Sequence, residues 1–133
     1  MKRLLGTIAI AFVFLLSACA GGGGANTEAP AFQTITATQA RELMEDGEPF
    51  ILLDVRNPDE FASQRIDGAI LIPATRIGDL APEHMPDLDA RILLYCRSGS
   101  RSSSAARALA EMGYTYIYDF GGIIDWPYET IRG

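Results

Sequence analysis

The stretch RILLYCRSGSRSSSAARALAEMG, residues 91–113, decides the fold. Residues 91–95 are mostly apolar and predict a buried strand, whereas residues 101–112 carry apolar side chains at helical spacing. Gly113 supplies a left-handed stop for that helix. Cys96 lies between the two elements, so the sequence predicts a thiol at the tip of a strand, facing the first turn of the next helix.

The loop that follows the thiol is suited to holding an anion, and it consists of Arg97, Ser98, Gly99, Ser100 and Arg101. Its glycine and small serines allow successive backbone N–H groups to point at one centre, and its two arginines add positive charge. Such surroundings lower the pKa of a thiol from about 8.5 to roughly 3.5–7.5. The loop therefore predicts a reactive thiolate at Cys96, with an inert buried cysteine as the alternative.

The first residues of the chain have the pattern of an export signal. Lys2 and Arg3 precede a run of thirteen apolar or small residues, 4–16, which is shorter than the roughly 17–25 residues of a membrane-spanning helix. The next residues complete Leu-Ser-Ala-Cys, which resembles the lipobox of bacterial lipoproteins. The resemblance implies a signal peptide at 1–18 and lipid on Cys19; the alternative is a plain signal peptide cut nearby.

Composition divides the remaining chain into a tether and one domain. Residues 19–31 comprise the lipidated cysteine and a flexible glycine-rich tether, and residues 32–133 are enough for a single core. Without Lys2 and Arg3, nine basic residues stand against seventeen acidic ones, a net charge of −8. No basic stripe is present, so we expect no nucleic-acid partner. The predicted location is the cell envelope, lipid-anchored with the domain on the periplasmic or extracellular side, and inner versus outer membrane stays open.

If Cys19 carries lipid, Cys96 is the only free thiol of an exported domain, where thiols are usually paired. The chain has no Cys-x-x-Cys pair, which disfavours internal disulfide exchange. Its only histidine, His84, falls in a proline-bearing loop predicted at 81–89 and is expected to be solvated. A cysteine–histidine hydrolase is therefore disfavoured, and no metal or other cofactor is predicted.

Alternating strands and helices predict an α/β domain with a mainly parallel five-stranded sheet and helices on both faces. The strands are expected at residues 32–35, 50–55, 69–72, 91–95 and 114–120. The helices are expected at about 36–46, 57–64, 75–80, 101–112 and 123–131. Thr36 with Gln39 and Asn57 with Glu60 have the spacing of helix N-terminal caps. Ligands of such sheets bind at the carboxyl ends of the strands, where Cys96 is placed.

Four blocks in order resemble the rhodanese-like sulfurtransferases over residues 32–128. They are residues 53–61 with LDVR, 66–73 with IDGAILIP, 96–106 from the cysteine, and 121–126 with GGIIDW. The resemblance implies that the Cys96 thiolate attacks the outer sulfur of a donor such as thiosulfate, expels sulfite and holds a persulfide. A thiophilic acceptor, a thiol or cyanide, then removes that sulfur. The alternative is a non-catalytic module of the same fold that carries sulfur or binds a partner.

Loop length separates this chain from related phosphatases and arsenate reductases, which place an arginine sixth after the cysteine. Here Arg101 is fifth and Ser102 is sixth, so a sulfur atom fits better than a phosphate. By resemblance, Asp54 and Arg56 lie beside the active-site mouth as supporting residues; the alternative is an ordinary surface ion pair. Arg65 stands where the family often has histidine, which leaves donor preference open.

The remaining positions are interpreted as structural. Glu60 is expected to cap its helix, Gly68 to make a tight turn and Trp126 to pack over the sheet edge. Residues 102–104 are three serines, taken as small residues in the first turn of a helix.

Overall fold

The computed structural model describes residues 31–133. The predicted signal peptide, Cys19 and most of the predicted tether lie outside the described residues. A five-stranded sheet has the order β1-β6-β5-β2-β4, and every neighbouring pair is parallel. Its strands are β1 (Gln33–Thr34), β2 (Ile51–Asp54), β4 (Ile70–Leu71), β5 (Arg91–Cys96) and β6 (Tyr116–Gly122). The predicted sheet is confirmed.

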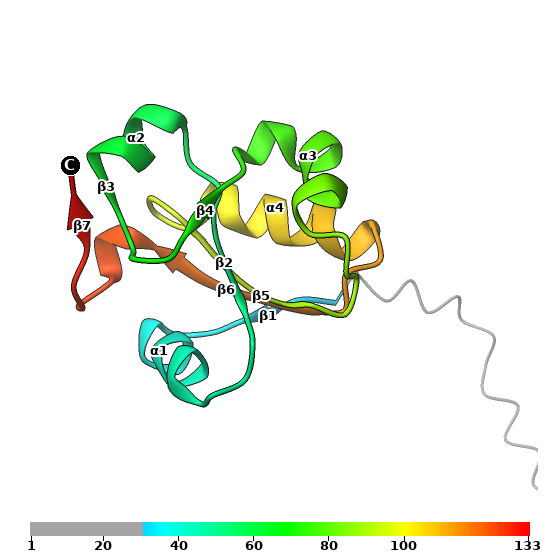
Figure 1. The fold of residues 1–133 in the computed structure, drawn as a ribbon, viewed down its shortest axis with the longest axis horizontal. Helices are drawn as coiled ribbons and strands as arrows, with labels where there is room; N and C mark the ends of the chain where they lie inside the picture. Colours follow the sequence, from blue (N-terminus) through cyan, green and yellow to red (C-terminus); the bar gives the residue numbers. More distant parts are fainter. Residues whose placement is uncertain (1–30) are drawn as a thin grey trace, which may run out of the picture.

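Helices cover both faces of this sheet, as predicted. In Figure 1, α1 (Ala37–Glu45) lies on one face, and α3 (Ile77–His84) and α4 (Ser100–Glu111) lie on the other. The short α2 (Pro58–Ser63) follows β2. Alternate residues of β5 point to opposite faces, so Ile92 and Leu94 pack under α3 and α4, whereas Leu93 and Tyr95 pack on the α1 side. Within residues 31–133, no helix is long and apolar enough to cross a membrane.

Local capping signals set where the helices begin. Thr36 Oγ1 accepts from the backbone N–H of Gln39 at 3.1 Å, and the Gln39 side chain accepts from the Thr36 N–H at 2.9 Å. Glu60 Oε2 likewise accepts from the Asn57 N–H at 2.9 Å. These capping hydrogen bonds satisfy backbone N–H groups at the helix N-termini that have no partner inside the helix.

The predicted closing helix at 123–131 is wrong. The chain makes one 3₁₀ turn, η2 (Ile123–Asp125), and ends in strand β7 (Ile131–Arg132), which pairs antiparallel with β3 (Gln64–Arg65). Pro127 disfavours the helical conformation of the residue before it, and Trp126 is extended, with φ −80° and ψ 109°. The two-stranded sheet therefore closes the domain where a helix was expected.

The loop predicted at 81–89 is wrong in its first half. After the 3₁₀ turn η1 (Ala74–Arg76), α3 continues to His84 and passes through Pro82. Ala81 on this helix and Met85 directly after it are buried in the core, and that packing offsets the hydrogen bond that proline removes. His84 is the exposed last residue of the helix, so its expected solvation is confirmed.

Candidate active site

Cys96 ends β5, which lies between β6 and β2 at the carboxyl edge of the sheet. The backbone then turns through Gly99, whose φ of 109° is in the left-handed region that favours glycine, and enters α4 at Ser100. The loop folds back over the sulfur and leaves Cys96 only 1% exposed. The thiol thus lies beneath its own loop, residues 97–102, which we call the cup because its Gly99 and Ser102 contact the sulfur.

Two groups of the cup contact the sulfur directly. The Gly99 N–H donates to Cys96 Sγ at 3.0 Å, and the Ser102 hydroxyl oxygen lies 3.6 Å from Sγ. Burial by itself would raise the pKa of the thiol. The hydrogen bonds of the Ser102 hydroxyl and of the backbone N–H groups of Ser102, Gly99 and Ser98 outweigh burial and lower the pKa of Cys96 below its ordinary value. The cup therefore favours the thiolate.

This balance predicts a measurable titration. The ultraviolet absorbance of the thiolate should rise with a midpoint below the ordinary pKa of a free cysteine. Ser102→Ala should move that midpoint upward, because it removes the hydroxyl that stabilises the charged form. Cys96→Ser serves as the blank for tyrosine ionisation. An unchanged or lower midpoint in Ser102→Ala would contradict the assignment.

Ser102 is a site residue that the sequence interpretation missed. It is fully buried, and its hydroxyl is 3.1 Å from the Gly99 carbonyl and 3.4 Å from the Gly121 carbonyl. It therefore connects the cysteine loop to the end of β6. A signal was present in the sequence, because Ser102 precedes Ala105, Ala106 and Leu109 at the spacing of one helix face, and that face is buried.

The two loop arginines have different surroundings. Arg101 donates to both carboxylate oxygens of Glu60, at 2.7 and 2.9 Å, whereas Arg97 is exposed and forms no ion pair within residues 31–133. Glu60, predicted only as a helix cap, caps α2 and also binds the loop arginine. This pairing joins α2 to α4 and could not be inferred from either segment alone.

Asp54 and Arg56 form a buried ion pair, which excludes the alternative of an ordinary surface pair. The side chains are 0% and 5% exposed, and Arg56 Nη2 lies 2.7 Å from Asp54 Oδ2. Arg56 also donates to the Gln64 carbonyl at the start of β3. The pair therefore anchors β3, and through it β7, to the end of β2. Neither residue hydrogen-bonds the Cys96 loop, so a supporting role at the site stays a prediction.

Gly122 is a second residue whose role the sequence interpretation missed, since it was quoted only as part of the block at 121–126. It is the partner of Cys96 in the pairing of β5 with β6. A Cβ atom here would lie 2.2 Å from the Arg97 carbonyl oxygen and 2.7 Å from Ser98 Cα, both backbone atoms. Only glycine leaves room for the loop at this approach, although its φ of −116° is ordinary.

Gly122→Ala is expected to displace the cysteine loop and to slow any reaction at Cys96 by about a hundredfold, the cost of misplacing a reacting group by about 1 Å. The measurement is the rate of the reaction at Cys96 together with the free energy of unfolding. Gly78→Ala is the matched control, because nothing lies within 4 Å of that position. On helix α3 it should raise stability by about 0.5–1 kcal/mol and leave the rate unchanged. Equal rates for the two variants would contradict the packing argument.

The other predicted structural residues fall as follows. Gly68 has a φ of 82° and makes the expected tight turn. Trp126 is buried and packs against Phe120, with ring centroids 5.3 Å apart. Arg65, in place of the family's usual histidine, lies over the Phe61 ring at 5.2 Å and pairs within the two-stranded sheet. It therefore packs on α2, away from the sulfur contacts.

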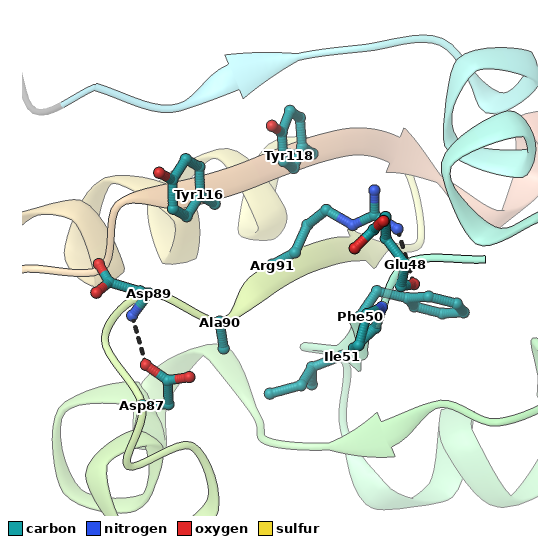
Figure 2. Close-up of a pocket in the computed structure, with 10 residues that line it drawn as sticks. Glu48, Phe50, Ile51, Asp87, Asp89, Ala90, Arg91, Tyr116 and Tyr118 are labelled. Carbon is teal, nitrogen blue, oxygen red and sulfur yellow. Dashed lines mark hydrogen bonds between the residues drawn. The ribbon is translucent and has the colours of Figure 1, made fainter. Parts of the chain in front are cut away.

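A separate hollow of about 520 Å³ lies at the amino ends of β2, β5 and β6, opposite Cys96. Figure 2 shows its lining, which includes Phe50, Arg91, Tyr116 and Tyr118. It contains no thiol, and Arg91 is bound by Asp46 at 2.6 Å. The candidate site is instead the cup around Cys96, where the thiol meets the Gly99 N–H and lies near the charge of Arg101. No group of three or more metal-ligating side chains occurs in the described part of the chain.

The protein is thus an α/β domain with a buried thiol at the carboxyl edge of its parallel sheet, which makes Cys96 the candidate nucleophile. Residues 36–127 match the rhodanese-like domain family. Thiosulfate sulfurtransferase PspE of Escherichia coli K12 is 32% identical over 81 residues, 61% of this chain and 78% of PspE. Thiosulfate sulfurtransferase GlpE of Pseudomonas syringae is 35% identical over 107 residues, 77% of this chain and 97% of GlpE.

A solved structure described as a rhodanese with anions from E. coli has a TM-score of 0.60 at 30% identity. The match covers 64% of this chain and 100% of that one. The chain belongs to the rhodanese-like family, and both named relatives are sulfurtransferases.

Proposed function

We propose that this protein is a sulfurtransferase that carries a sulfane sulfur on Cys96 as a persulfide, from a donor such as thiosulfate to a thiol or cyanide. The observation that carries the proposal is the cup: a thiol whose pKa is lowered, with the Gly99 N–H 3.0 Å from its sulfur. Burial makes the largest single contribution and raises the pKa of Cys96, but the hydrogen bonds together lower the pKa by more. Membership of the sulfurtransferase family supports the same chemistry.

The reaction balances without an oxidant. The Cys96 thiolate attacks the outer sulfur of thiosulfate, and a new S–S bond forms between Cys96 Sγ and that sulfur. At the same time the S–S bond of the donor breaks, and its electron pair leaves on sulfite. The resulting persulfide carries its negative charge on the terminal sulfur, which the N–H groups of the loop stabilise as they stabilise the thiolate. The acceptor thiolate or cyanide then attacks the terminal sulfur and releases the Cys96 thiolate. No general base is required, because every attacking group is already an anion.

The test is sulfur uptake by the purified domain. Residues 32–133 incubated with thiosulfate should gain the mass of one sulfur atom, on the peptide that contains Cys96, and cyanide should remove it as thiocyanate. If polysulfide, thiosulfate and an alkyl persulfide all leave the mass unchanged, the enzymatic proposal is wrong. A non-catalytic module of the same fold is then the remaining interpretation.

We also propose that the protein is a lipoprotein of the cell envelope, on the strength of the lipobox-like sequence that ends at Cys19. The full chain expressed in bacterial cells should incorporate labelled fatty acid. Cys19→Ala should lose the label, whereas Cys96→Ala should keep it. Unchanged labelling of Cys19→Ala would overturn the anchor.

A further inference from the structure

The charges around the cysteine cup are almost completely paired. Arg56 is bound by Asp54, and Arg101 is bound by Glu60, so each of these arginines has a carboxylate against it. Arg97 is the remaining arginine of the loop and has no ion pair within residues 31–133. Of these three arginines, only Arg97 therefore has no carboxylate partner within residues 31–133, although the sequence suggested two unpaired arginines in the loop.

The pairing of Glu60 with Arg101 is preorganised. Glu60 is held by the Asn57 N–H at 2.9 Å, and its two oxygens meet two nitrogens of the guanidinium. The hydrogen bonds from Arg101 are the main reason that the pKa of Glu60 falls to about 2, so this carboxylate stays ionised at neutral pH. Arg101 in turn feels the charge of the nearby thiolate, after its stronger interaction with Glu60; both raise its pKa.

We propose that Glu60 is a positioning residue that holds Arg101 away from incoming anions and thereby makes the site favour singly charged sulfane donors, such as alkyl persulfides, over the doubly charged thiosulfate. This inference rests on the proposed function of Cys96. A thiosulfate ion beside the thiolate places three negative charges at the mouth, whereas an alkyl persulfide anion places two. With Glu60 in place, only Arg97 is free to balance the additional charge.

The reaction is the same for both classes of donor. The Cys96 thiolate attacks the outer sulfur of R–S–S⁻, and a new S–S bond forms between Cys96 Sγ and that sulfur. The S–S bond of the donor breaks, and its electron pair leaves on the R–S⁻ thiolate. Only the charge of the donor and of the leaving group differs. Selection between donors is therefore electrostatic and depends on how many arginines at the mouth are available.

The experiment compares Glu60→Gln with Asp59→Asn on thiosulfate and on an alkyl persulfide. Glutamine keeps the side-chain oxygen that caps α2 but no longer holds Arg101 by charge. Asp59 is an exposed neighbour on the same helix without an ion pair in the described residues, so it controls for the charge change alone. Glu60→Gln should lower the KM for thiosulfate roughly fivefold, the scale of one partly exposed ion pair.

The KM for the alkyl persulfide should stay within about twofold in Glu60→Gln, and Asp59→Asn should change neither KM by more than that. Added salt should raise the thiosulfate KM more steeply in Glu60→Gln, since screening weakens a newly available charge. The double variant Glu60→Gln/Arg101→Gln should show no gain on thiosulfate.

Equal changes for the two donors, or a fall in kcat with both KM values unchanged, would overturn the inference and give Glu60 a purely structural role. The free energy of unfolding of each variant shows whether the fold is retained. Absence of sulfur uptake by the wild type from every donor would instead overturn the proposed function. The two failures are therefore distinct.

Discussion

Replacing Cys96 by serine is expected to reduce sulfur transfer to the rate of donor and acceptor mixed without protein. Serine has nearly the same shape and fits the buried position, but its hydroxyl is not ionised where a thiolate is. An oxygen also cannot form the persulfide that the proposed reaction passes through. The measurement is thiocyanate formed from thiosulfate and cyanide, together with intact mass after exposure to the donor alone.

The matched control for this variant is Ser104→Ala on α4. The Ser104 side chain is exposed, and within residues 31–133 its hydroxyl hydrogen-bonds only the Ser100 carbonyl, at 3.4 Å, so its removal should leave the rate unchanged. Circular dichroism and denaturant unfolding establish that both variants fold. Residual transfer by Cys96→Ser within tenfold of the wild type would show that another group carries the sulfur, and the cup would lose its proposed role.

Replacing Arg56 by alanine is expected to lower the free energy of unfolding by about 3–5 kcal/mol, the usual cost of leaving one partner of a buried ion pair without the other. Asp54 is 0% exposed, so its carboxylate would remain buried without a cation. The Gln64 carbonyl would also lose its donor, and the anchoring of β3 would weaken. Denaturant unfolding measures the effect. Because domains are stable by about 5–15 kcal/mol, a loss of this size is large.

Arg107→Ala provides the control, since Arg107 is an exposed arginine of α4 with no ion pair in the described residues. Its removal should change stability by no more than about 0.5 kcal/mol. A loss of less than about 1 kcal/mol in Arg56→Ala would contradict the buried pair. Asp54 and Arg56 would then behave as the ordinary surface ion pair that the sequence left open as an alternative.

The strand at 91–95, the helix that follows it and the cysteine between them could be predicted because their signals are local. Apolar runs and helical spacing report burial within a few residues, and Gly99 with its neighbouring serines has the composition of an anion-holding turn. The same local logic located the caps at Thr36 and Asn57 and the order of strands and helices.

The errors came from contacts between distant segments. Residues 131–132 form a strand because residues 64–65 offer an edge, and no local pattern contains that pairing. A short polar-apolar segment can adopt either structure, and tertiary pairing decides between them. The extent of α3 past Pro82 follows for the same reason, since burial of Ala81 and Met85 outweighs the proline.

The sequence by itself determined the α/β class, the parallel sheet and the position of the Cys96 thiol at the carboxyl end of a buried strand. Only the tertiary structure showed that Ser102 touches the sulfur, that Gly122 makes room for the loop and that Glu60 holds Arg101. The physical reason is the sequence separation over which each interaction acts. Periodicity and capping act over one or two turns of chain, whereas the charge and shape of the cup arise from β5, β6, α2 and α4 meeting at one edge of the sheet.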